Sequence, residues 1–243
     1  MIRRPPRSTL DRSSAASDVY KRQGVTLTMS NLFTLFPTLI YKDALSEHAE
    51  LKKKYVPELI ELFKQQPDKK APWAKFCNSW QDNEFFVNNP DKRNLLEDAI
   101  TPHIHKWFKR YNLSSFDYKI TYWFNVHTSD MYQETHDHML GQLVVCGIYY
   151  LQLSEEDTPV VFVPHQTIYQ SHLRNIGITH NHEELAFDSS DILKIKEGDL
   201  ILFAPDSKHL APKAKQKHKG YRISLAFNVA ITHPFIPQGT HEN

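Results

Sequence analysis

Cysteine is scarce in this chain of 243 residues, which contains only Cys77 and Cys146. Two cysteines exclude a disulfide framework and fit a reducing compartment, so we expect a cytoplasmic protein. No apolar run approaches the length of a membrane span, and we expect no membrane partner. The sequence also lacks a glycine-rich phosphate loop, a nucleophile elbow and a Cys-x-x-Cys pair. The motifs of phosphate-loop, serine-hydrolase and thiol-redox chemistry are therefore missing.

Positive charge is concentrated at the beginning of the chain. Residues 1–23 carry six basic and two acidic side chains, or +4, which leaves −3 on the rest of a chain of net charge +1. A basic arm for nucleic acid is one interpretation of this segment, and a twin-arginine signal is another, although no apolar stretch follows Arg3 and Arg4. The segment also resembles translated adapter sequence from the ends of metagenomic assemblies, so we expect a native start at Met29. Residues 1–28 are then a non-native or disordered tail, residues 29–243 form a single domain, and nucleic acid is not expected as a partner.

Helical spacing of apolar residues precedes a series of strand-like runs. We expect a strand over residues 31–41, helices within residues 43–66 with Pro57 opening the second, and a further helix from Asn89-Pro90-Asp91. Runs rich in β-branched and aromatic residues then predict strands over residues 118–126, 143–153, 159–163, 191–195, 199–203 and 222–229. The polar segment 164–191 is predicted to be a long loop over the site entrance. This order predicts an α+β, mainly β domain, in which N-terminal helices flank a jelly roll.

A His-x-His pair stands before one of these strands. His136 and His138 occupy positions i and i+2, which point to the same face of a strand, so both can reach one ion. Imidazole suits iron, zinc, copper or nickel, and an isolated pair is also typical of solvated loops. A second stretch gives the pair significance: residues 198–203 read Gly-Asp-Leu-Ile-Leu-Phe, His209 follows a short loop, and residues 222–224 read Arg-Ile-Ser.

Together these stretches resemble the iron(II)- and 2-oxoglutarate-dependent dioxygenases. In that superfamily one strand end carries His-x-Asp/Glu, a later strand often reading Gly-Asp-Leu-Ile-x-Phe leads to a distal histidine, and a final strand carries Arg-x-Ser. Residues 35–41, Leu-Phe-Pro-Thr-Leu-Ile-Tyr, are similar to the opening of a family of small oxygenases from phages and bacteria, which has His-x-His at the first site. The resemblance spans residues 31–229. It implies a double-stranded β-helix of the cupin type, and an enzyme that uses iron(II), 2-oxoglutarate and O2 to hydroxylate a substrate with release of succinate and CO2.

The resemblance implies three metal ligands, His136, His138 and His209, and no catalytic side chain beyond them. His138 stands where the superfamily usually has a carboxylate. Its neutral imidazole removes one negative charge from the ligand set and widens the choice of ion towards zinc or nickel. Asp137 or Glu134 remains an alternative third ligand. His218, within a lysine-rich run, is the rival of His209.

Four further residues are expected to bind the cosubstrate. Arg222 is the candidate anchor for the distal carboxylate of 2-oxoglutarate, because a guanidinium is always charged and grips a carboxylate through two hydrogen bonds. Ser224 shares its strand face. Tyr150 resembles a tyrosine that contacts the same carboxylate in the prolyl-hydroxylase branch, although Tyr149 or core packing is an alternative. Asn125 is a candidate contact to cosubstrate or ligand, or else a turn-forming asparagine.

Other interpretations stay open. His180 and His182 could hold a surface metal, but a solvated loop is the preferred interpretation. The chain could also be a cupin-like metal enzyme or a non-catalytic jelly-roll binding module that does not use 2-oxoglutarate. The substrate, a small molecule or a protein, and the oligomeric state do not follow from the sequence.

Overall fold

The computed structural model describes residues 38–65, 90–113, 116–163 and 192–232. The chain divides into two units, Met1–Pro37 and Thr38–Asn243, and every described residue belongs to the second. The predicted tail of residues 1–28 and the predicted loop of residues 164–191 lie outside the described ranges, as do His180 and His182. Within those ranges, no helix combines the length and the apolar character needed to cross a membrane.

Within the described residues, the first strand, β1 (Ile40–Ala44), is followed by two helices. Helix α4 (Pro90–Arg110) begins at the predicted proline, whose fixed φ suits a first helical turn. Helix α2 (His48–Gln65) runs through Pro57 without a break, so the prediction of a second helix at this residue is wrong. The buried side chains of α2 lie on both sides of Pro57, which is itself exposed. Burial of this continuous apolar face maintains the helix despite the backbone hydrogen bond that proline removes.

Five antiparallel strands form the larger sheet, in the order β1-β6-β4-β8-β2. Its other members are β2 (Tyr118–His127), β4 (Leu143–Gln152), β6 (Asp199–Phe203) and β8 (Arg222–Ile231). These four agree with the predicted strands over residues 118–126, 143–153, 199–203 and 222–229. β1 begins later than predicted, because Thr38 and Leu39 are not in strand conformation.

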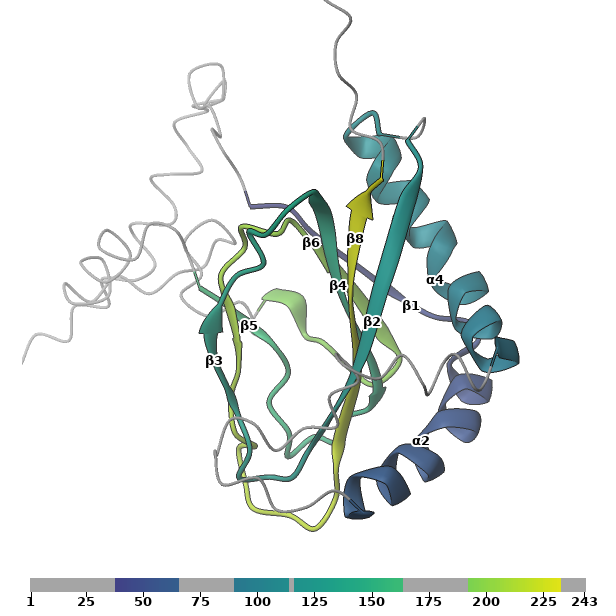
Figure 1. The fold of residues 1–243 in the computed structure, drawn as a ribbon. Coiled ribbons are helices and arrows are strands. Elements are labelled where there is room, and N and C mark those ends of the chain that lie inside the picture. The colour runs from purple at the N-terminus through teal and green to yellow at the C-terminus, as the bar shows by residue number, and fades with distance from the viewer. Residues whose placement is uncertain (1–37, 66–89, 114–115, 164–191, 233–243) are drawn as a thin grey trace, which may run out of the picture. The chain divides into compact units, whose positions relative to one another are not determined.

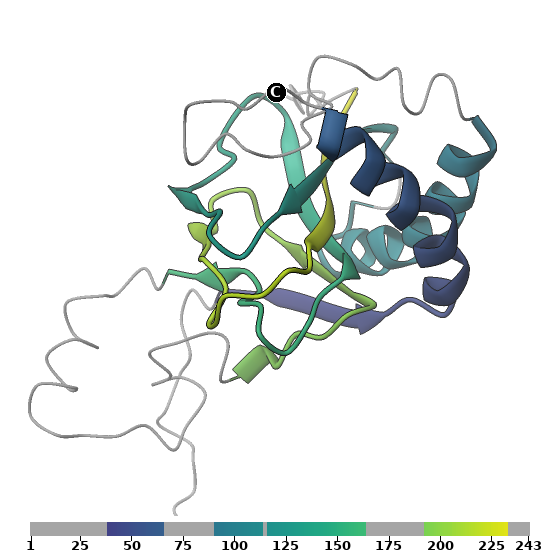
Figure 2. The same cartoon turned by 90° about the horizontal axis from the view of Figure 1, so that it is seen from below.

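A smaller antiparallel sheet contains the short strands β3, β7 and β5, in that order. They span Gln133–His136, His209–Ala211 and Val161–Phe162, respectively. Helices α2 and α4 lie on one side of the larger sheet, and β3 and β5 lie on its other side (Figures 1 and 2). The described residues therefore form a mainly β arrangement with flanking helices, as the sequence predicted.

Strand alternation gives the larger sheet two different faces. On β2, Tyr122, Phe124 and Val126 belong to the core cluster that includes the helices. The intervening residues Trp123 and Asn125 line a cavity on the opposite face. β8 follows the same rule, with Ile223, Leu225, Phe227 and Val229 in the helix-side core and Arg222, Ser224, Ala226 and Asn228 at the cavity. The period of two thus separates a packing face from a polar face.

The predicted strand over residues 191–195 is wrong. Ile192 and Leu193 are helical, and Lys194 has a φ of 44°, which a strand cannot accommodate. Ile195 is nevertheless buried, in a cluster with Phe203 and Phe162. The apolar residues that suggested a strand therefore pack against the core from an irregular segment.

Candidate functional site

A cavity of about 160 Å³ opens against the polar face of the larger sheet. Residues from both sheets line it, and they include every candidate that the sequence favoured for metal or cosubstrate binding: Asn125, His136, His138, Tyr150, His209, Arg222 and Ser224. Three imidazoles occupy one part of this lining, and a buried guanidinium occupies another.

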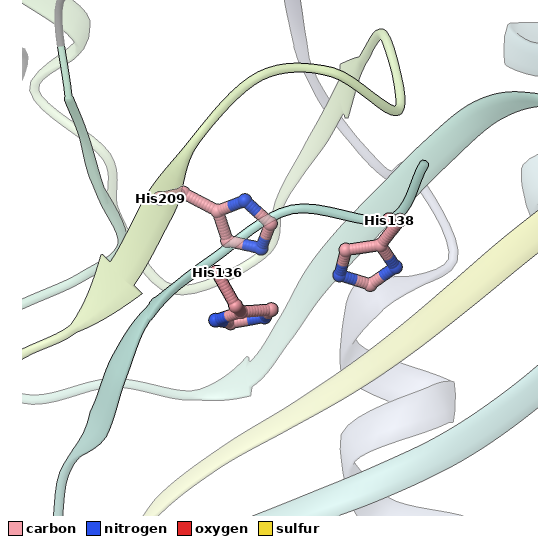
Figure 3. Close-up of side chains that lie close together, drawn as sticks. All are labelled: His136, His138 and His209. Carbon is pink, nitrogen blue, oxygen red and sulfur yellow. The ribbon is translucent and has the colours of Figure 1, made fainter. Parts of the chain in front are cut away.

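The three histidines come from neighbouring segments of the smaller sheet. His136 ends β3 and pairs directly with His209 on β7. His138 follows in the loop after β3, where its backbone N–H donates to the carbonyl of Pro205 at 2.8 Å and so joins the two histidine-bearing segments. One nitrogen from each ring lies within 4.8 Å of the other two. Figure 3 shows the three rings turned towards one another.

Each ring is held by a hydrogen bond at Nδ1. His136 Nδ1 donates to the carbonyl of Glu134 and His209 Nδ1 to the carbonyl of Ser207, both at 2.8 Å. His138 Nδ1 donates to Asn228 Oδ1 at 2.9 Å. Because each partner is an oxygen acceptor, each neutral ring carries its proton on Nδ1 and presents the lone pair of Nε2.

The environment of the Nε2 atoms fits metal coordination. His138 Nε2 is buried and has no hydrogen-bond partner within the described part of the chain. Among the described residues, His136 Nε2 has a long contact of 3.4 Å with the Gln133 amide nitrogen. Three imidazoles fixed by outer hydrogen bonds, with Nε2 atoms that converge, are a donor set suited to iron, zinc or nickel.

Burial keeps His138 and His209 neutral. Desolvation lowers the pKa of His209 to about 3, and the neighbouring His136 and His138 act in the same direction. The pKa of His138 is also lowered, chiefly by burial. A metal ion requires deprotonated nitrogen ligands, so His138 and His209 are in the competent form at neutral pH.

The alternative ligands do not join this cluster. Glu134 and Asp137 are exposed, and neither carboxylate belongs to the group of nitrogens within 4.8 Å. Asp137 Oδ1 instead accepts from the backbone N–H of Met139 at 3.3 Å. His218, the predicted rival of His209, donates from Nε2 to Asp157 Oδ1 at 2.9 Å. The structure therefore groups His136 with His138 and His209 alone among the described residues.

Arg222 is a buried cation without a carboxylate partner within hydrogen-bonding distance in the described ranges. Only 4% of the residue is exposed, and burial lowers the pKa of the guanidinium. Its Nη1 donates to the carbonyls of Thr158 and Pro212, the latter at 2.8 Å. Its Nη2 is buried and has no partner among the described residues. A buried cation whose hydrogen bonds go to backbone carbonyls is costly, so this end of the cavity is suited to an anion.

The other candidate cosubstrate residues surround Ser224. Asn125 on β2 and Tyr150 on β4 are its cross-strand neighbours, one on each side. The Tyr150 hydroxyl accepts from the Val160 N–H at 2.7 Å, and its own proton remains to be donated. The choice between the two tyrosines is clear, because Tyr149 packs in the helix-side core while Tyr150 lines the cavity.

Among the residues of the cavity, sequence reasoning missed Asn228 and His127, which hold or adjoin the candidate site residues. Asn228 continues the inward-facing alternation of β8 and holds His138, and His127 continues that of β2 and pairs across the sheet with Arg222. Neither belongs to a recognisable motif. The period of two from Ser224 and from Asn125 was the available signal.

The strands that carry this cavity match a known protein family. Residues 121–228, from β2 to β8, match the family model described as "Putative 2OG-Fe(II) oxygenase". No curated protein shows significant similarity to the chain.

The fold is shared with solved structures, among them SnoK and HygX. SnoK, a non-heme alpha-ketoglutarate-dependent carbocyclase from nogalamycin biosynthesis, is 13% identical with a TM-score of 0.51, over 80% of this chain and 80% of that chain. HygX from Streptomyces hygroscopicus is 14% identical with a TM-score of 0.50, over 80% of this chain and 84% of that chain. At such identities the likeness establishes the fold alone, and it confirms the predicted double-stranded β-helix.

Proposed function

We propose that the protein is an iron(II)- and 2-oxoglutarate-dependent oxygenase, because residues 121–228 match the family model of 2OG-Fe(II) oxygenases and the residues of this cavity fit that chemistry. The bound metal and cosubstrate supply the oxidant for a substrate C–H bond, while 2-oxoglutarate becomes succinate and CO2. The polypeptide must therefore bind both groups, orient the substrate and exclude water.

His136, His138 and His209 hold the metal through Nε2 in this proposal. Above all, their three Nε2 atoms converge while each Nδ1 is occupied by an oxygen acceptor. Three ligands on one face of an ion leave positions for cosubstrate and oxygen. Because all three ligands are neutral, they leave the positive charge of the ion undiminished. A dianionic cosubstrate is therefore attracted to this centre more strongly than to one in which a carboxylate ligand already offsets part of that charge.

Arg222 receives the distal carboxylate of 2-oxoglutarate, assisted by Ser224, Tyr150 and Asn125. The unpaired Nη2 supports this role, since a buried guanidinium is strongly stabilised by an anionic partner. Tyr150 supports it as well, because burial raises its pKa to about 12 and keeps its hydroxyl proton in place as a donor. HygX, whose fold is similar, has been solved with nickel, 2-oxoglutarate and hygromycin B bound.

The reaction proposed for this chain is hydroxylation of a small molecule or a protein side chain. A cytoplasmic location and a single oxygenase domain over residues 29–243 belong to the same proposal, and they rest on the cysteine content and the motif order of the sequence.

Formation of succinate tests the assignment. Protein supplied with iron(II), 2-oxoglutarate and O2 is expected to release succinate, and His209→Ala is expected to release none above the level of free iron. His218→Ala is a matched control, because His218 is the other histidine of this part of the chain and bonds to Asp157 rather than to the cluster. Equal release from wild type and His209→Ala would defeat the proposed ligand set.

A further inference from the structure

One end of the cavity contains an unusual pair of polar side chains. His127 ends β2 directly opposite Arg222 on β8, and both residues are 4% exposed. Neither ring nitrogen of His127 has a hydrogen-bond partner in the described part of the chain, and the same holds for Arg222 Nη2. Three buried nitrogens without partners therefore lie on two paired residues that line the same cavity.

The bonding of Arg222 leaves room for a second donor beside it. Both protons of Nη1 are directed to backbone carbonyls, those of Thr158 and Pro212. An end-on grip through both terminal nitrogens is thus not available to a ligand, which must approach Arg222 from the side of Nη2. Nη2 can meet one oxygen of a carboxylate, which leaves acceptor capacity on the other oxygen.

We propose that His127 donates a hydrogen bond to the distal carboxylate of 2-oxoglutarate, beside Nη2 of Arg222. The inference rests on the proposed function and adds a binding residue to it. A neutral imidazole carries one N–H, which is the donor that the second oxygen requires. Burial and the adjacent Arg222 both lower the pKa of His127, in agreement with a neutral ring before the anion arrives.

A purely structural role explains His127 less well. A buried polar atom without a partner costs about 1–3 kcal/mol, so a ring that only fills space here would be better supplied by phenylalanine. The position of His127 is that of a neighbour of Arg222, which lies directly opposite on β8, and Arg222 is the charge among the described residues that lowers the pKa of His127. Its contribution is therefore expected at the distal carboxylate and not at the metal.

Calorimetric titration of nickel(II)-loaded protein measures this contribution without turnover. His127→Phe keeps a ring of similar size but removes the donor, and it is expected to weaken 2-oxoglutarate binding by ~10- to 100-fold, as for one hydrogen bond to a charged group. 2-Oxopentanoate, which has a methyl group in place of the distal carboxylate, is expected to bind wild type and His127→Phe equally. His127→Gln restores an amide donor and is expected to recover part of the affinity for 2-oxoglutarate.

The outcomes separate this inference from the proposed function. Failure of wild-type protein to bind 2-oxoglutarate would contradict the proposed function itself. If wild type binds and His127→Phe binds equally well, or if the substitution weakens both keto acids alike, His127 is not a carboxylate donor. His105→Phe, on the exposed surface of α4, is the control for replacement of a histidine by phenylalanine. Unchanged nickel affinity in all variants would show that the cavity has kept its fold.

Discussion

Replacement of Asn228 by leucine is expected to weaken metal binding, although Asn228 is not a ligand. Its Oδ1 accepts from His138 Nδ1 at 2.9 Å, and only 7% of the residue is exposed. This hydrogen bond selects the tautomer that leaves Nε2 of His138 free. Leucine fills a similar volume but accepts nothing, so the ring can change tautomer or turn away from the other two histidines.

The magnitude follows from the loss of one buried outer hydrogen bond. Such a loss at a metal-binding histidine reduces metal affinity by about 10- to 100-fold, which corresponds to roughly 1.4–2.7 kcal/mol. Asn228→Asp provides the opposite perturbation, because a carboxylate accepts the same bond, raises the basicity of the ring and adds a negative charge. The expected metal affinity of Asn228→Asp is therefore equal to or above that of wild type, and the affinity of Asn228→Leu is the lowest of the three.

Competition with a chromophoric chelator under anaerobic conditions measures the affinity for iron(II) in all three proteins. Circular dichroism of the metal-free proteins monitors whether the fold is retained. Wild-type affinity in Asn228→Leu, with the fold intact, would refute the idea that Asn228 orients His138.

Two further predictions concern stability. A Cβ on Gly147 would overlap the ring of Phe227, which is fully buried. Gly147→Ala is therefore expected to cost about 1–3 kcal/mol of unfolding free energy. In urea unfolding this cost should be smaller in a Phe227→Leu background, and an equal cost in both backgrounds would contradict a clash with the ring. Lowering the pH should destabilise the metal-free protein, because burial depresses the pKa of His209 to about 3 in the folded state. In the unfolded chain the pKa of this histidine is about 6.5, so the unfolded state binds more protons as the pH falls below that value. His209 alone then accounts for a loss of about 2 kcal/mol of unfolding free energy between pH 7.5 and pH 5. Urea unfolding in chelator should show a weaker pH dependence in His209→Gln, and an unchanged dependence would count against a neutral, buried His209.

The sequence predicted the cluster of histidines because two separate motifs carry it. The His-x-His pair and the strand leading to His209 are each recognisable from the spacing of their residues. In the structure the two motifs lie on or next to paired strands, where His136 is opposite His209. Asn228 and His127 have no such motif. Their roles depend on strand register. The pairing of β2, β4 and β8 determines which residues lie next to Arg222 and His138, and this pairing is not evident from the sequence.

Local propensity was misleading at two places. Pro57 predicted a helix boundary, but apolar residues on both sides of it share one buried face, and their packing determines the helix. The run from Asp191 to Ile195 suggested a strand, but Lys194 adopts a left-handed conformation and the preceding two residues are helical. In both segments tertiary packing decided the conformation, which a single sequence does not reveal.

The binding of metal and 2-oxoglutarate in one cavity is tested most directly by anaerobic absorption spectroscopy of the iron(II)-loaded protein. Bidentate chelation of the metal by the keto acid produces a charge-transfer band, so titration with 2-oxoglutarate is expected to raise a saturable band in wild type. In Arg222→Ala the same band is expected to require about 30-fold or more 2-oxoglutarate, because loss of a buried charged partner costs about 2–5 kcal/mol. Arg222→Lys should recover only part of this loss. A wild-type protein that binds iron(II) but shows no band, or an Arg222→Ala variant that saturates like wild type, would contradict this assignment of the cavity.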